Sequence, residues 1–116
     1  MGEGLLSYLP YDSGAMREAA GAMRTQAGQL TMIGSEVTGA GGSMTFDGPA
    51  GDRIRQELSD CGRHAARAGE GLTRAAGQLD RAADDVDTQN AAIRRHNDQV
   101  LASMPPLERR LVLENR

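Results

Sequence analysis

Apolar residues recur at every seventh position over a long stretch of this chain, and this repeat constrains the fold more than any other feature. Only a long α-helix brings residues seven apart into line along one face. Such a stripe is stable when it packs lengthwise against another helix, so the pattern predicts helical packing. The stripe consists of Leu58, Ala65, Leu72, Leu79, Val86, Ile93 and Val100.

Rows of small residues accompany this stripe. They would let a second helix backbone approach closely, because Ala and Gly add almost no bulk to a helix surface. The two rows consist of Cys61, Ala68, Ala75 and Ala82, and of Gly62, Gly69, Ala76 and Ala83.

An earlier stretch repeats this arrangement. Its larger residues are also seven apart, and a small residue follows the first three of them by four positions. We therefore expect two helices of matching pattern. The earlier stretch contributes Met16, Met23, Leu30 and Val37, with Ala20, Ala27 and Gly34.

Helix boundaries follow from Gly, Pro and capping residues. Helix one is expected over about residues 13–40, after a cap at Asp12 or Ser13. Glycines at 39, 41 and 42 are expected to break it, and residues 41–48 form the turn. Helix two is expected over about residues 49–103, because Pro49 suits a first turn and Pro105 ends a helix. Residues 104–116 form a tail with one or two loose turns.

The two helices are expected to differ in length. At about 1.5 Å per residue, helix one spans roughly 40 Å and helix two roughly 80 Å, so helix two should overhang helix one. Residues 1–12 read as extended, because Pro10 disfavours helix at the residue before it. They could lie along the overhang and bury Leu5, Leu6 and Leu9 there. The small rows turn polar beyond Asp87, with Gln89, Asn90, His96 and Asn97.

The hairpin core is thin. The chain has one Phe and no Trp, and each Gly inside a helix costs about 0.5–1 kcal/mol relative to Ala. We therefore predict an all-α, elongated antiparallel helix-turn-helix hairpin that assembles with a partner into a four-helix bundle. A hairpin complete in itself remains the alternative. The expected partner interface consists of Met16, Met23, Leu30, Val37, Leu58, Ala65, Leu72, Leu79, Val86 and Ile93.

The turn carries a family resemblance. Phe46-Asp47-Gly48, followed by Pro49-Ala50-Gly51-Asp52-Arg53-Ile54-Arg55, resembles the Trp-x-Gly turn and second helix of the WXG family of type VII secretion proteins, which includes the early-secreted-antigen-like proteins. The resemblance covers residues 13 to about 100. It implies a non-enzymatic substrate or targeting chaperone, with Phe46 and Gly48 shaping a turn that a partner or translocase reads.

Two departures from the family pattern bear on export. Phe46 lacks the indole N–H of Trp, so only apolar docking remains there. The family's Tyr-x-x-x-Asp/Glu export signal near the end of helix two has no match, since Tyr8 and Tyr11 are the only tyrosines. The resemblance then implies a cytoplasmic protein that is exported as a pair or escorts a larger effector. Its partner would be a second copy, a WXG-like hairpin or the helical amino-terminal domain of an effector.

Other functional classes find little support in the sequence. The net charge is −3, and the Arg94-Arg95 and Arg109-Arg110 pairs lack aromatic neighbours, so we expect no nucleic-acid partner. No apolar run reaches the ~20 residues that span a bilayer. No Lys or Arg precedes the short apolar patch before Pro10, so we expect neither membrane insertion nor a secretory signal peptide.

Catalytic and metal chemistry also lack a supporting pattern. Glu57, Cys61 and His64 share one helical face, but no second Cys or His pair accompanies them and Cys61 falls in a predicted core row. The acidic cluster is expected to be solvated surface, and we expect no catalytic, cofactor or metal site. A structural helical-bundle subunit unrelated to secretion, and a small metal-binding protein, remain as alternative functions. The acidic cluster is Asp80, Asp84, Asp85 and Asp87.

Overall fold

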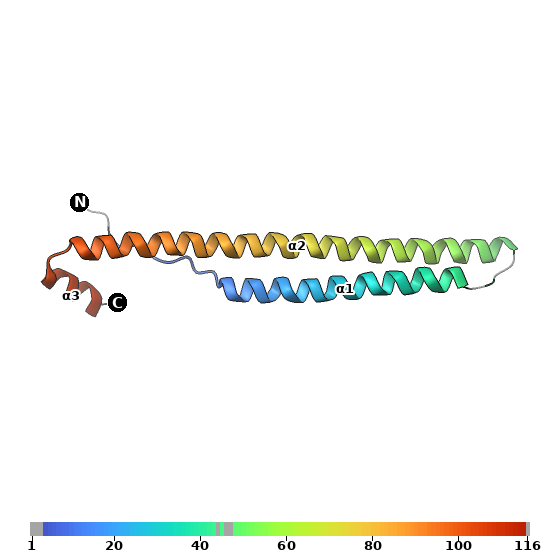
Figure 1. The fold of residues 1–116 in the computed structure, drawn as a ribbon, viewed down its shortest axis with the longest axis horizontal. Helices are drawn as coiled ribbons and strands as arrows, with labels where there is room; N and C mark the ends of the chain where they lie inside the picture. Colours follow the sequence, from blue (N-terminus) through green and yellow to red (C-terminus); the bar gives the residue numbers. More distant parts are fainter. Residues whose placement is uncertain (1–3, 44, 46–47, 116) are drawn as a thin grey trace. The chain divides into compact units, whose positions relative to one another are not determined.

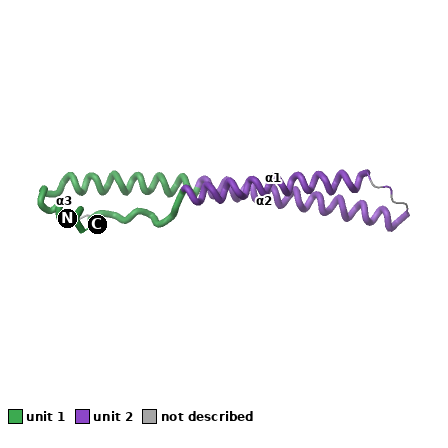
Figure 2. The backbone as a smooth tube through the Cα atoms, turned by 90° about the horizontal axis from the view of Figure 1, so that it is seen from below, with its two compact units in different colours: residues 1–13, 82–116 green, residues 14–81 purple. Residues whose placement is uncertain are grey.

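The chain is described by a computed structural model over residues 4–43, 45 and 48–115. These residues form helices α1 (Ser13–Ser43), α2 (Gly48–Ser103) and α3 (Pro106–Glu114), and no strand occurs among them. The predicted all-α class is confirmed. The chain divides into two compact units, one of residues 14–81 and the other of residues 1–13 with 82–116, and α2 contributes to both (Figure 2).

The unit of residues 14–81 is an antiparallel helical hairpin. In it α1 runs alongside the first part of α2 (Figure 1), and Gly34 and Gly62 lie against each other at the contact. The predicted hairpin is therefore confirmed. Helix propensity alone would not favour α1, whose 31 residues include several glycines, so packing against α2 stabilises it.

The end of α1 differs from the sequence prediction. The helix continues through Gly41 and Gly42 to Ser43, although these residues were expected to form the turn. Gly41 is buried, and a β-carbon on it would lie 3.2 Å from the Leu58 β-carbon. A larger residue here would push Leu58 by a few tenths of an ångström, so glycine lets the last turn of α1 pack closely against α2, and this packing outweighs the low helix propensity of glycine.

The start of α2 depends on backbone conformation. Gly48 has a φ of 81°, in the left-handed region that glycine adopts without steric cost. Pro49 follows in the first turn of α2. The N–H groups of a first turn have no acceptor within the helix, so the lack of an N–H in proline costs no hydrogen bond there. Phe46, the aromatic residue of the predicted turn motif, lies outside the described residues.

The other unit combines three segments. Residues 4–12 are not helical, and residues 4–9 follow α2 through hydrogen bonds to its side chains. After α2 ends at Ser103, Pro106 begins α3, a helix of 9 residues or about two and a half turns. We call residues 4–9 the strap.

Candidate protein-interaction site

Small residues form the closest contact between α1 and α2. We call these two sets of residues the contact rows, and every member is buried. They carry little or no side chain, so the two helix backbones approach each other closely. The contact rows are Ala20, Ala27, Gly34 and Gly41 on α1, and Gly62, Gly69 and Ala76 on α2.

The geometry at the glycines shows how close the approach is. A β-carbon on Gly34 would lie 2.8 Å from the Gly62 carbonyl oxygen, and one on Gly69 would lie 2.9 Å from the Ala27 carbonyl oxygen. Both distances are shorter than van der Waals contact. At these two levels the hairpin therefore has no room for a side chain.

The larger residues of the heptads flank this contact and are only half-buried. A β-carbon on Gly34 would lie 3.5 Å from the Ala65 β-carbon, so the larger row reaches the edge of the contact without filling it. We call these residues the large rows. They are Met16, Met23, Leu30 and Val37 on α1, and Leu58, Ala65, Leu72 and Leu79 on α2.

Both large rows lie on the same side of the hairpin. In each helix a large residue precedes a contact-row residue by four positions, which turns it by about 40° around the helix axis. Because the two axes run in opposite directions, the same turn moves both rows to one side of the plane that contains the two helices. We call this side the apolar face.

Exposed apolar residues widen the apolar face. Each residue just before a contact-row position lies about 100° around the helix axis from the contact, on the same side as the large row. Ile33 is 48% exposed there, and Cys61 and Ala68 are exposed as well. The prediction that Cys61 belongs to the core is wrong, because the row containing it points away from α1. No charged residue occurs in this row, which is Ala19, Gln26, Ile33 and Ala40 on α1, and Cys61, Ala68 and Ala75 on α2.

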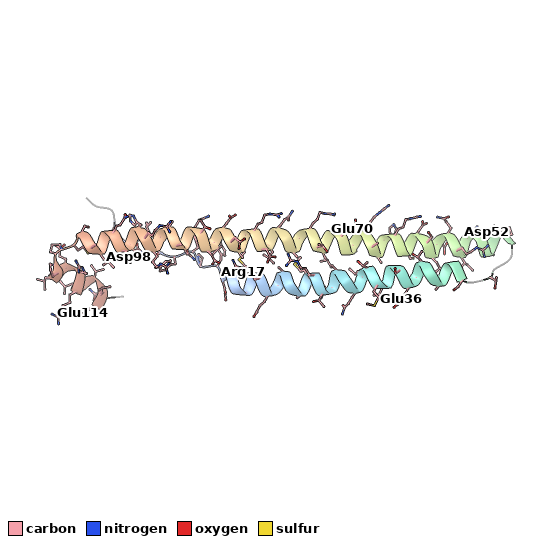
Figure 3. The ribbon with its side chains drawn as sticks, in the orientation of Figure 1. Arg17, Glu36, Asp52, Glu70, Asp98 and Glu114 are labelled. Atoms are coloured by element: carbon pink, nitrogen blue, oxygen red, sulfur yellow. The ribbon has the colours of Figure 1, made fainter. Side chains whose placement is uncertain are left out.

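The opposite side of the hairpin is polar. Four residues after the contact rows, Arg24 and Asp80 form an ion pair of 2.6 Å between the two helices. Thr31 and Thr73 hold equivalent positions, and each hydroxyl donates to the carbonyl four residues earlier. Charged residues labelled in Figure 3, such as Glu70, are exposed. The hairpin is therefore two-sided, because the row after the contact on this side carries charge whereas the large rows and the row before the contact carry none.

Two predicted interface residues lie in the other unit. Val86 is 7% exposed and Ile93 is half-buried, so the chain itself covers most of their surface. The structure thus brings together eight of the predicted residues, the large rows, on the apolar face, and the other two belong to the second unit.

Asparagine side chains hold the strap against α2. Asn97 is 3% exposed, and its amide pairs with both polar groups of the Leu6 main chain. The Leu6 N–H donates to Asn97 Oδ1 at 2.8 Å, and Asn97 Nδ2 donates to the Leu6 carbonyl at 3.0 Å. The Leu9 N–H donates to Asn90 Oδ1 at 2.8 Å. The strap therefore lies on α2 as the sequence suggested, but Leu6 is 47% exposed, so its predicted burial is wrong.

The spacing of the asparagines matches the spacing of the strap. Asn90 and Asn97 are seven helical residues apart, a rise of about 10.5 Å. Leu6 and Leu9 are three extended residues apart, about 10 Å. The two asparagines continue the seven-residue repeat of the contact row on α2. This repeat is the sequence signal that could have identified them as the residues that bind the strap.

Further polar contacts hold both ends of the amino-terminal segment. His96 Nε2 donates to the Gly4 carbonyl at 3.2 Å. Ser13 Oγ donates to Asp87 Oδ1 at 2.6 Å, at the first residue of α1. Asp87 and the ion-paired Asp80 thus make specific contacts, so these two acids are more than the solvated surface predicted for them.

Beside the strap lies an open cavity of about 230 Å³, lined by Tyr8, Asp87, Asn90, Ala91 and Arg94. No group of three or more His, Cys, Asp or Glu residues suited to a metal ion occurs in the described part of the chain. The cavity is thus an open hollow with both polar and apolar lining beside the strap.

An arginine of α3 caps the end of α2. Arg109 Nε donates to the Leu101 carbonyl at 2.8 Å, and Arg109 Nη2 donates to the Met104 carbonyl at 3.3 Å. The last carbonyls of a helix lack intrahelical donors, and a cation there also meets the negative end of the helix dipole. The sequence predicted only a loose tail here. An Arg shortly after the Pro-Pro pair is the signal that it offered.

Comparison with known proteins finds no family model, no curated protein and no solved structure that matches this chain. None of the helices, within the residues described, is both long enough and apolar enough to cross a membrane.

Proposed function

We propose that this chain is a non-enzymatic protein-interaction module whose hairpin pairs with a second helical hairpin through the apolar face, forming a four-helix bundle. The observation that carries the proposal is that the large rows lie together, half-buried, on the one side of the hairpin that has no charge in its rows. The ion pair between Arg24 and Asp80 lies on the other side. Such a division is typical of a helix pair that is one layer of a bundle.

The energetics favour a partner. Complete burial of a Leu or Met side chain contributes about 1.5–3 kcal/mol relative to exposure, and the large rows realise only part of that contribution within the hairpin. The contact rows bury mainly methyl groups and glycines, at about 0.8 kcal/mol per methyl. Covering the half-buried Met, Leu and Val side chains would therefore add a driving force that the hairpin alone lacks.

The finer proposal is a WXG-like subunit of a type VII secretion system. It is supported by the order of helix α1, the sequence Phe46-Asp47-Gly48 and the longer helix α2, which begins at Gly48. The partner would be a second copy, a WXG-like hairpin or the helical amino-terminal domain of a secreted effector. Because the chain lacks a Tyr-x-x-x-Asp/Glu signal near the end of α2, the partner would supply the export signal. Export that is lost on Phe46→Ala would separate this role from that of a cytoplasmic bundle subunit.

The direct test is the light-scattering mass of the purified chain, measured together with its helicity. A helical particle of twice 12.3 kDa would indicate self-pairing. A poorly helical monomer would indicate a different chain as the partner. A stably folded helical monomer that binds no second hairpin would contradict the proposal.

A matched pair of variants locates the interface. Ile33 and Met32 are neighbours on α1 and are 48% and 62% exposed, but only Ile33 lies on the apolar face. Ile33→Asp should abolish pairing while hairpin helicity is kept, because the position is exposed within the hairpin. Met32→Asp introduces the same charge on the other side and should pair normally.

A further inference from the structure

The hydrogen bonds that hold the strap on α2 use its main chain. Each hydrogen bond that Asn90, His96 and Asn97 form with it uses a strap N–H or carbonyl. The Leu6 and Tyr8 side chains are 47% and 49% exposed. The α2 side chains therefore recognise an extended backbone, and within the strap only the half-buried Leu5 and Leu9 restrict side-chain identity.

The positions of Asn90 and Asn97 also match the direction and spacing of the strap main chain. The Asn97 amide satisfies the donor and the acceptor of one residue, and the Asn90 carboxamide oxygen accepts from the N–H three residues later. An extended backbone advances about 3.3 Å at each residue, so three residues span the distance between Asn97 and Asn90. Only an extended segment can therefore bind both asparagines in this way. A helical segment would advance less than half that distance.

We propose that Asn90, His96 and Asn97 form a binding site for an extended polypeptide segment that is recognised through its main chain, with the strap as its occupant in cis and the strap of a second copy as its occupant in trans. The strap of a second copy already has the required spacing, and its Leu5 and Leu9 are the side chains that become half-buried. This site shares no residue with the apolar face. Occupation in cis is favoured because a short tether holds the strap at an effective concentration of about millimolar.

Two full-length variants separate the strap from the site. The strap variant, Leu6→Pro with Leu9→Pro, removes both N–H donors but leaves the asparagines intact. The site variant, Asn90→Ala with Asn97→Ala, removes the asparagine amides but leaves the strap intact, and Ala is compatible with helix α2. Circular dichroism of each variant checks that its helicity equals that of the native chain.

The experiment mixes isotope-labelled strap variant with unlabelled site variant and follows the Asn90 and Asn97 side-chain amide resonances by NMR. The site of the labelled chain can be filled only by the strap of the other chain. We expect both resonances to move towards their native positions as the site variant is added up to about millimolar concentration, the effective concentration of the tether. No movement over this range would overturn the proposal.

The control is unlabelled strap variant added to labelled strap variant. It carries the same apolar face but no competent strap, so pairing of hairpins alone cannot mimic the expected result. Equal movement in this control would also overturn the proposal. As a second measurement, Asn97→Ala in an otherwise native chain should raise the hydrogen-exchange rate of the Leu6 amide by about tenfold, because that amide loses its acceptor. An unchanged rate would contradict recognition by Asn97.

Discussion

Gly34 of α1 lies directly against the main chain of Gly62 of α2, so that a β-carbon on Gly34 would be 2.8 Å from the Gly62 carbonyl oxygen. Glycine inside a helix costs about 0.5–1 kcal/mol relative to Ala, so intrinsic propensity opposes both residues. Their presence in the two helices reflects the close approach of the backbones. The separation of the helices thus depends on residues that weaken each helix by itself.

Gly34→Ala should lower the free energy of unfolding by about 1–3 kcal/mol, because the new methyl group overpacks a backbone contact. Gly28→Ala is the matched control in the same helix, since a β-carbon there meets nothing within 4 Å. It should raise the free energy of unfolding by about 0.5–1 kcal/mol. Urea denaturation at equal chain concentration measures both changes. A stabilising Gly34→Ala would mean that α1 and α2 are less closely packed than the structure indicates.

Leu72→Asp should both lower helicity and prevent pairing, in contrast to the exposed Ile33→Asp. Leu72 is half-buried in a large row, so the carboxylate would be placed partly inside the hairpin contact. We expect a loss of about 2–5 kcal/mol in the free energy of unfolding, similar to that of a large core truncation. Circular dichroism and light scattering would detect the two effects. Unchanged helicity with unchanged mass would show that the assignment of the large row is wrong.

The ion pair between Arg24 and Asp80 should contribute little to stability. Its side chains are 47% and 35% exposed, so solvent screens the attraction. A double-mutant cycle with Arg24→Ala and Asp80→Ala should give a coupling energy of about 0.2–1 kcal/mol that falls further in high salt. A coupling that persists at molar salt would indicate a role beyond a screened surface pair.

Arg109→Ala should release α3 from the end of α2. The guanidinium donates to the carbonyls of Leu101 and Met104, and these would then rely on water. Hydrogen exchange of the α3 amides should become faster, whereas the amides of α1 should keep their exchange rates. Arg110→Ala is the control, because Arg110 instead pairs with Glu114 of α3 at 3.5 Å. Equal effects of the two substitutions would contradict the capping role of Arg109.

Local sequence features determined the helices and most of their ends. Heptad periodicity and the positions of Pro49 and Pro105 each act over a few residues along the chain, so α2 and the hairpin could be predicted directly. The small rows, and the change to Asn90 and Asn97 beyond them, were also visible in the sequence. The function proposed for the apolar face rests on this same heptad pattern.

The tertiary structure alone decided which row forms the helix contact and what the polar residues bind. The large and small rows are only about 40° apart around each helix, so periodicity cannot say which one faces the other helix. The distance between the helix axes determines which row forms the contact. This distance depends on residues that are distant in sequence, such as Gly34 and Gly62. The continuation of α1 through Gly41 and the pairing of Asn97 with Leu6 have the same origin. Each is a contact between segments that no local pattern connects.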